Sequence, residues 1–158
     1  MRATPHSVAI RSREAAVLSL TLYAEAGGRP VRAIEALAAL VMNRLAAGRP
    51  EWGVGVEAVC RAPFHFPCWN PRHPRHTVLR AVPPADPAMA ICRRIAARAI
   101  AGVLPDPTGG ATHYHEETVL PGWARAEAPL AALGGLVFYR PVPGAPPVPA
   151  SWPALALA

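Results

Sequence analysis

Apolar residues recur at helical spacing near the start of the chain. Leu18, Leu22 and Glu25 stand at positions i, i+4 and i+7, so the glutamate lies on the apolar stripe of a helix rather than on its wet face. We expect this helix to span residues 13–26. The glycine pair at 27–28 should end it, because glycine readily adopts the conformations that terminate helices.

A second apolar stripe predicts another helix over residues 30–48. Pro30 suits the first turn of a helix, and Gly48 suits its end. The short turn between the two segments makes them a helical hairpin. The residues that form this second stripe are Ile34, Leu37, Ala38, Val41 and Leu45.

Helical periodicity disappears over residues 49–85 and then returns. The segment without periodicity is rich in proline, tryptophan and histidine, and we expect a long loop of the kind that often carries function. Asp86 then provides an N-cap, Pro87 a first helical residue and Gly102 a stop. A third helix is therefore predicted between Asp86 and Gly102.

Two short strands are predicted after the helices. A turn signature at 106–110 precedes a strand over 111–115, and a second strand over 137–139 is expected to pair with it. Residues 141–158 are so rich in proline that an extended tail is expected there rather than a packed element. The sequence thus predicts one α+β domain over residues 1–140, with a helical hairpin and a short antiparallel β-hairpin.

Composition agrees with a globular domain and narrows its partners. Hydrophobic residues make up 52% of the 158-residue chain and charged residues 16%, which excludes an intrinsically disordered protein. The net charge of +6 suits a polyanionic partner such as a cell wall, a membrane surface or nucleic acid, and does not choose among them. All 16 basic residues are arginines, and they are scattered rather than gathered in a run, which argues against nucleic acid as the partner. No apolar run approaches the roughly 18 residues that span a bilayer.

The N-terminus partly imitates a signal peptide. Arginines precede the apolar segment 15–24, and small residues flank Glu25 as they would at a cleavage site. Glu14 directly before the apolar segment is unusual for such a leader, and the same residues fit a folded helix. We therefore expect a protein made in the cytoplasm without a signal peptide, which would need a holin, a phage-like particle or lysis to reach a substrate outside the cell.

Glu25 is the candidate catalytic residue. A carboxylate on an apolar stripe at a helix end loses water, and this favours the protonated form that a general acid needs at neutral pH. The glycines at 27–28 leave room for a bulky substrate. The spacing alone also fits a solvated glutamate at a frayed helix end, so the assignment depends on the motifs around it.

Ordered motifs along the chain carry further information about function. They read YAEAGGRP at 23–30, LVMNR at 40–44, FPCWN at 66–70, DPTGGATHYH at 106–115, WA at 123–124 and VFY at 137–139. In this order they resemble the SleB-type cell wall hydrolases, the spore cortex-lytic family and its phage-like relatives. The resemblance covers about residues 15–140, and the ordered set is more specific than any one motif.

The resemblance implies a small lysozyme-like α+β domain that cuts the glycan backbone of peptidoglycan between N-acetylmuramic acid and N-acetylglucosamine. The glutamate of the family's tyrosine–alanine–glutamate motif is its catalytic acid, which here is Glu25. No metal or organic cofactor is implied. The chain departs from the family with Gly27-Gly28-Arg29, where arginine–glycine–glutamate is common, and with Leu136, where a histidine is common.

The number of suitable carboxylates predicts the reaction type. A lytic transglycosylase needs one carboxyl group, which protonates the glycosidic oxygen and then deprotonates the muramic 6-hydroxyl to close a 1,6-anhydro ring. Simple hydrolysis usually needs a second carboxylate about 5–9.5 Å away. We expect Asp106 to cap its own turn and Glu35 to lie on a wet helix face, which leaves Glu25 without such a partner. A lytic transglycosylase mechanism is therefore predicted, with muramidase-type hydrolysis as the variant.

Residues on the first predicted strand are candidates for substrate contacts. Alternation places Thr112 and Tyr114 on one face, and His113 and His115 on the other. Either pair is compatible with a sugar-binding role, and we favour Tyr114. Core packing is the structural alternative for this aromatic residue.

Other candidate substrate contacts lie outside the strand. Thr108 is a candidate to orient the acid through its hydroxyl group, and Asn43 is a candidate polar group buried between the helices near the site. Trp69 and Trp123 are candidates to stack on sugar rings. A purely structural role is the alternative for each of them.

Two other functions remain compatible with the sequence. Cys60, His65, Cys68, His73 and His76 are of the types that bind zinc, although few of them have the usual spacing of two to four residues. A non-catalytic wall-binding module would use the tryptophans and the positive charge. The odd number of cysteines favours free thiols over a bridge between Cys60 and Cys68. The expected partner is the peptidoglycan glycan strand, bound by a monomer.

Overall fold

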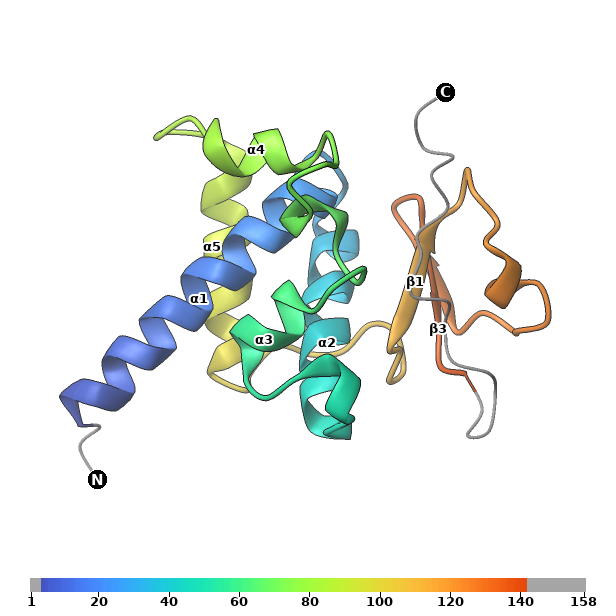
Figure 1. The fold of residues 1–158 in the computed structure, drawn as a ribbon, viewed down its shortest axis with the longest axis horizontal. Helices are drawn as coiled ribbons and strands as arrows, with labels where there is room; N and C mark the ends of the chain where they lie inside the picture. The colour runs from blue at the N-terminus through green and yellow to red at the C-terminus, as the bar shows by residue number, and fades with distance from the viewer. Residues whose placement is uncertain (1–3, 142–158) are drawn as a thin grey trace.

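Helices form one side of the molecule and a small sheet forms the other (Figure 1). The structure, a computed structural model, describes residues 4–141. The α-helices are α1 (Pro5–Ala26), α2 (Val31–Ala47), α3 (Val56–Arg61), α4 (His76–Arg80) and α5 (Pro87–Ile100). The 3-10 helices are η1 (Pro50–Trp52), η2 (Pro67–Trp69) and η3 (Gly122–Ala124), and the strands are β1 (His113–Glu116), β2 (Ala131–Leu133) and β3 (Leu136–Tyr139).

The first helix is longer than predicted. It begins at Pro5 rather than at residue 13, and the Thr4 hydroxyl caps it by accepting from the backbone N–H of Ser7 at 3.3 Å. This outer part of α1 projects past the other helices (Figure 1), and Val8 and Ile10 are 50% and 46% exposed. The prediction missed it because these turns bury no apolar stripe.

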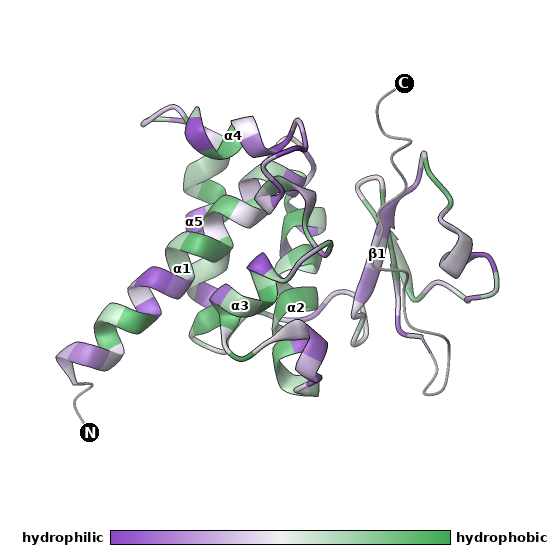
Figure 2. Cartoon of the chain, in the orientation of Figure 1, coloured by the Kyte–Doolittle hydropathy of each residue, from purple (hydrophilic) through white to green (hydrophobic). Residues whose placement is uncertain are grey.

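The helical hairpin is confirmed. α2 covers nearly the predicted range, and Gly48 ends it with a φ of 62° while its N–H donates to the Arg44 carbonyl at 3.3 Å. The stripe lies against α1 and α5, and hydrophobic residues follow α2 in Figure 2. Each fully buried leucine there contributes roughly 1.5–3 kcal/mol. The buried residues of the predicted stripe are Ile34, Leu37, Ala38 and Val41, whereas Leu45 is half-buried.

The segment 49–85 is not the unstructured loop that was predicted. It contains the short helices α3 and α4 and the 3-10 helices η1 and η2. Each of these elements is six residues or fewer, too short to show a helical period in the sequence. The segment wraps the end of α1 and brings η2 and α4 against it.

The third long helix is confirmed with its cap. The Asp86 carboxylate accepts from the N–H of Ala88 at 2.8 Å, and Pro87 is the first residue of α5. The Tyr23 hydroxyl also donates to Asp86, at 2.6 Å, which ties this cap to α1. α5 packs along α1 and α2 through a buried face made of Met89, Cys92, Ile95, Ala96 and Ala99.

The sheet has one strand more than predicted. β1 and β3 pair antiparallel, as expected, with Tyr114 opposite Phe138. The tight hairpin, however, joins β3 to the unpredicted β2, and the strand order is β1-β3-β2. β2 is only Ala-Ala-Leu, a sequence with little strand preference.

The turn between β2 and β3 requires glycine. Gly134 and Gly135 have φ values of 57° and 82°, the left-handed region that the favoured two-residue hairpin turns use. The turn also lies against the start of α2, where a Cβ on Gly134 would stand 2.7 Å from the Cβ of Ala33. The hairpin is therefore held both by its own turn and by the helical body.

The sequence also predicts that the chain has no membrane-spanning segment and that it ends in an extended tail. No helix among residues 4–141 is long and apolar enough to cross a membrane. The proline-rich tail predicted for 141–158 lies, apart from Pro141, outside the described residues.

Candidate active site

Glu25 occupies the last turn of α1, where the helical body meets the sheet. Its side chain is fully buried, at 0% exposure. Oε1 accepts from the backbone N–H of Cys68 at 2.9 Å, whereas Oε2 accepts from the Tyr114 hydroxyl at 3.3 Å and from Arg75 Nη1 at 2.6 Å. The carboxyl group is thus held by α1, by β1 and by the segment around η2.

The surroundings of Glu25 act on its charge in opposite directions. Burial penalises the carboxylate, as predicted from the apolar stripe. The guanidinium of Arg75 and the N–H of Cys68 instead stabilise it. The sequence-based expectation of a protonated acid was therefore incomplete, because it took burial into account and did not foresee Arg75.

Tyr114 reaches Glu25 from the middle of β1. Its ring is stacked against Phe66 at 6.1 Å and Phe138 at 6.2 Å between centroids, which fixes the direction of its hydroxyl. Burial and the neighbouring Glu25 raise the pKa of Tyr114 well above its ordinary value. The hydroxyl therefore keeps its proton and acts as a hydrogen-bond donor to the carboxylate.

The segment from η2 to α4 supplies the other contacts. Cys68 donates through its backbone, and its carbonyl is hydrogen-bonded to His76 Nδ1 at 2.9 Å. Burial raises the pKa of the Cys68 thiol, with a further contribution from Glu25, so the thiol stays neutral. His73 accepts from the backbone N–H of Arg75 at 3.1 Å, which fixes the backbone that presents the arginine.

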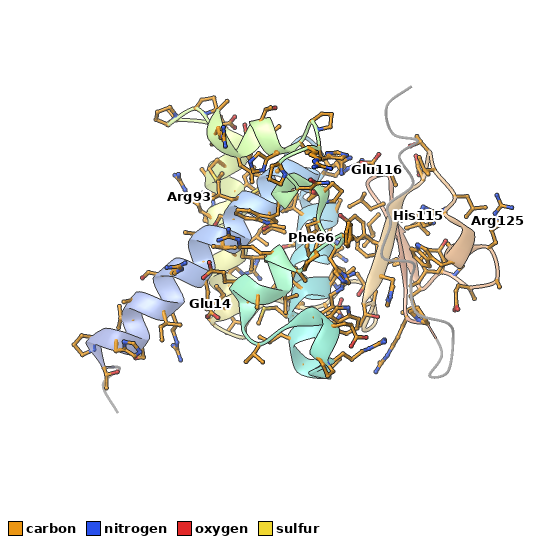
Figure 3. All side chains as sticks on the ribbon, viewed as in Figure 1. Glu14, Phe66, Arg93, His115, Glu116 and Arg125 are labelled. Carbon is orange, nitrogen blue, oxygen red and sulfur yellow. The ribbon has the colours of Figure 1, made fainter. Side chains whose placement is uncertain are left out.

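Arg75 joins Glu25 to a second carboxylate. Its Nη2 forms an ion pair with Glu116 Oε1, and Arg29 Nη2 contacts the same oxygen at 3.2 Å. Arg29 in turn donates to the Gly134 carbonyl at 3.0 Å. Figure 3 shows Phe66 and Glu116 on the side of the sheet that faces the helices and His115 on the far side.

Sequence reasoning missed Arg75, Glu116 and Arg29 as site residues. Glu116 had a usable signal, because it is two residues after Tyr114 on β1 and therefore shares its face. Arg75 had none, since it lies in a segment whose short helices show no period. The statement that Glu25 lacks a second carboxylate nearby is thus wrong, because Glu116 binds the same guanidinium.

Thr108, Asn43 and Asp106 form a structural turn. Asp106 caps it as predicted, accepting from the N–H groups of Thr108 and Gly110, both at 2.8 Å. Thr108 bonds Asp106 and the N–H of Ala111, and not Glu25. Asn43 donates to Asp106 at 2.9 Å and to the Ala111 carbonyl at 3.0 Å. The turn thereby anchors the start of β1 to α2.

Glu35, the other sequence candidate for a second carboxylate, lies in a different place. It is half-buried on α2 and forms ion pairs with Arg98 at 3.4 Å and Arg32 at 3.7 Å. Both partners are exposed arginines, as expected for the wet side of a helix.

The histidines of β1 lie on the face opposite to Tyr114. His113 and His115 contact the ring of Trp123, at 5.6 and 6.0 Å between centroids, and His115 shares a 2.9 Å hydrogen bond with the Tyr139 hydroxyl. Burial, followed by the charge of Arg44, lowers the pKa of His113 to about 3. The structure therefore brings Tyr114 to Glu25 and leaves this group on the other side of the sheet.

Trp69 lies beside α1 rather than on the carboxyl group. Its Nε1 donates to Thr21 Oγ1 at 3.0 Å, and the guanidinium of Arg61 lies 5.0 Å above its ring. The ring is half-buried next to Cys68, which contacts Glu25. A contact between the Trp69 ring and a sugar bound beside Glu25 stays a prediction.

The described residues do not gather into a metal site. No group of three or more histidine, cysteine, aspartate or glutamate side chains within residues 4–141 could hold an ion. The three cysteines are free and buried, and burial raises the pKa of Cys60 to about 12, which disfavours the thiolate that binds zinc.

Comparison with known proteins agrees with this geometry. The sequence profile of the family described as Cell Wall Hydrolase matches residues 28–139, a range that begins within the turn between α1 and α2 and does not include Glu25. No sequence among curated proteins matches the chain. The match to the profile covers more than half of the chain and therefore shows its family.

Two solved structures share the fold. The catalytic domain of the Bacillus cereus SleB protein superposes with a TM-score of 0.60 at 19% identity, covering 82% of this chain and 91% of that one. The catalytic domain of the germination-specific lytic transglycosylase SleB from Bacillus anthracis superposes with a TM-score of 0.62 at 21% identity, covering 80% and 93%. The predicted lysozyme-like α+β fold is thus confirmed, and the chain belongs to the cell wall hydrolase family.

Proposed function

We propose that the protein is a peptidoglycan-degrading glycosidase that works as a lytic transglycosylase, with Glu25 as its acid and base. The observation that carries the proposal is the fully buried Glu25 carboxyl group at the junction of helices and sheet, with the Tyr114 hydroxyl directed at it. Membership of the cell wall hydrolase family supports the substrate class, and the described activity of the Bacillus anthracis relative supports the reaction type.

The chemistry needs one carboxyl group in two successive roles. Glu25 donates its proton to the oxygen of the bond between muramic acid and glucosamine as that bond breaks. The resulting carboxylate then takes the proton of the muramic 6-hydroxyl, whose oxygen attacks the anomeric carbon and closes the 1,6-anhydro ring. The attacking hydroxyl is already tethered to the sugar, so its effective concentration is high and no water needs to be activated.

Glu116 does not change this proposal, although it is a second carboxylate near Glu25. Two arginines, Arg75 and Arg29, contact its Oε1. A carboxylate oxygen that two guanidinium groups already engage is less free to activate water or to attack a sugar carbon. Muramidase-type hydrolysis, which would use a second carboxylate to activate water or attack the sugar, is therefore the second candidate.

The candidates for substrate contacts fall into two groups. Tyr114 is proposed to contact both Glu25 and the sugar beside it. Trp69 remains a proposed sugar contact at a greater distance from Glu25. Trp123, His113 and His115 lie on the opposite face of β1, and they are proposed to affect substrate binding only through the packing of the sheet. Thr108 and Asn43 are proposed to act on the substrate only through the turn that they hold.

Mass spectrometry of digested wall sacculi tests the proposal. The wild-type chain should release muropeptides that end in 1,6-anhydro-muramic acid, and Glu25→Gln should release none. Glu35→Gln is the matched control, because it removes a helix glutamate whose partners are exposed arginines. Reducing-end muramic acid as the main product would establish hydrolysis instead. Binding to sacculi without any released product would establish a wall-binding module.

A further inference from the structure

Four alternating charges run from the sheet to Glu25. Arg29 contacts Glu116, Glu116 contacts Arg75, and Arg75 contacts Glu25. We propose that Arg75 and Glu116 are positioning residues that together set the protonation of Glu25, with Glu116 competing for the guanidinium that otherwise holds Glu25 as an anion. The effect of these residues on catalysis rests on the proposed function, whereas their effect on the charge of Glu25 rests on the geometry alone.

The guanidinium of Arg75 is divided between the two carboxylates. Nη1 lies 2.6 Å from Glu25 Oε2, and Nη2 contacts Glu116 Oε1. The two ends differ in exposure, since the Glu25 side chain is 0% exposed and that of Glu116 is 30% exposed. Arg75 thus joins a buried carboxylate to one at the surface, and the buried contact is the less screened of the two.

Charge balance explains why the competition matters. With Glu25 ionised, two arginines face two carboxylates and the four charges cancel. A proton on Glu25 leaves one positive charge in excess, so Arg75 opposes the acid form that bond cleavage needs. Glu116 offsets this effect, because it attracts the same guanidinium and adds a negative charge. Burial lowers the pKa of Arg75, but Glu25 and Glu116 outweigh burial and raise the pKa, so the arginine stays charged.

Three other titratable groups near Glu25 are neutral at neutral pH. The raised pKa values of Tyr114 and Cys68, which burial causes in both, keep their protons in place. His73 has a lowered pKa, first through burial and then through the charge of Arg75. Among the described residues in contact with Glu25, the formal charge therefore comes from Arg75, with Glu116 and Arg29 acting through it.

A carboxyl titration by NMR separates this role from a merely structural one. The full chain is labelled with 13C in its glutamate side chains, and the Glu25 signal is identified by its loss in Glu25→Gln. Glu116→Gln should lower the titration midpoint of Glu25 by about one pH unit, because the guanidinium is then undivided. Arg75→Gln should raise the midpoint by about one unit or more, and Arg75→Lys should restore much of the difference.

The matched control is the pair of Arg98 and Glu35, an ion pair between arginine and glutamate on α5 and α2. Arg98→Gln and Glu35→Gln should leave the midpoint of Glu25 in place. If Arg75→Gln does not fold, Glu116→Gln decides alone: a midpoint that falls supports the proposal, and one that stays or rises overturns it. Shifts of the same sign in Arg75→Gln and Glu116→Gln would also overturn it.

Sacculus digestion across pH then separates this inference from the proposed function. The alkaline limb of the activity profile should move down in Glu116→Gln and up in Arg75→Gln, in step with the NMR midpoints. If the NMR midpoints move as expected and the activity limb does not, the positioning role stands and Glu25 is not the catalytic acid. If the alkaline limb of the activity profile moves while the NMR midpoints of Glu25 stay in place, the positioning role is refuted.

Discussion

The two faces of β1 place polar side chains in very different surroundings. On the inner face, Tyr114 donates to a buried carboxylate and Glu116 binds two arginines. On the outer face, His113 and His115 pack against Trp123 and lie among aromatic rings. Three of these four residues are buried, so burial by itself does not distinguish the faces.

The two faces differ in their electrostatic environment rather than in polarity or burial. The inner face offers a donor and fixed charges to one carboxyl group. The outer face keeps His113 neutral, since burial and Arg44 lower its pKa to about 3. We therefore expect the inner face to govern activity and the outer face to govern stability, and the predictions below test that division.

The largest effect is expected at Glu25. Glu25→Gln keeps the shape of the side chain and cannot donate a proton, so wall-lytic activity should fall by about 10²–10⁴-fold while the fold persists. Release of soluble muropeptides from sacculi measures the loss, with a melting curve as the check on folding. A variant that keeps a tenth of the activity would remove Glu25 from the mechanism.

The outer face should make stability depend on pH. His113 has an ordinary pKa near 6.5 when unfolded and about 3 when folded, so the unfolded chain binds the proton more readily between these values. Its contribution is therefore complete above pH 6.5 and is lost as the pH falls toward 3. The free energy of unfolding should drop by about 2 kcal/mol from this residue by pH 5.

Denaturant unfolding at several pH values measures this effect. His113→Gln should flatten the dependence between pH 6.5 and 5 and should leave activity near neutral pH within a few-fold of wild type. An unchanged pH dependence would show that His113 is not kept neutral in the fold, and a large loss of activity would give the outer face a part in catalysis.

A smaller effect on activity is expected from Tyr114. Tyr114→Phe removes the hydroxyl that donates to Glu25 and keeps the ring between Phe66 and Phe138, so digestion should slow by about tenfold. Tyr139→Phe is the matched control, because it removes a hydroxyl that is bonded to His115 on the outer face. Equal losses in the two variants would contradict the division between the faces.

Removal of metal ions should have no effect at all. The aromatic surroundings of the outer histidines and the buried thiols of Cys60 and Cys68 are poor surroundings for zinc. Activity and melting temperature should be equal before and after treatment with a chelator. Stoichiometric zinc in the purified protein, with a fall in melting temperature on its removal, would make the outer face a metal site.

How much the sequence could predict depended on the length of each element. The stripe through Leu18, Leu22 and Glu25 predicted the burial of the acid, because a helix of several turns repeats its pattern often enough to be recognised. The Asp86 cap predicted the start of α5 equally well. Elements of three to six residues, such as η2 and β2, carry no such pattern, and their positions come from tertiary packing.

The candidate site followed the same rule. Spacing on regular elements predicted that Glu25 lies on a buried stripe and assigned Tyr114 to one face of β1, whereas the choice of Glu25 as the acid came from the motifs around it. Arg75 belongs to the segment between short helices, and what it contacts is decided by how that segment wraps α1. Glu116 could have been predicted by the alternation rule, because it lies two residues after Tyr114 and directly follows the motif that ends with His115.

The turn between β2 and β3 lies against Arg29 and can therefore affect the charges around Glu25. A Cβ at Gly135 would stand 2.5 Å from Arg29 Nη1, and Arg29 is the outermost of the charges that lead to Glu25. In a map of mutational tolerance, position 135 should therefore resemble an active-site residue although it is distant from Glu25 in the sequence and has no side chain to offer a substrate. A side chain at this position would push the end of the Arg29 side chain aside and would strain a backbone with a φ of 82°, so its replacement should disturb the turn and the contact between Arg29 and Glu116 together.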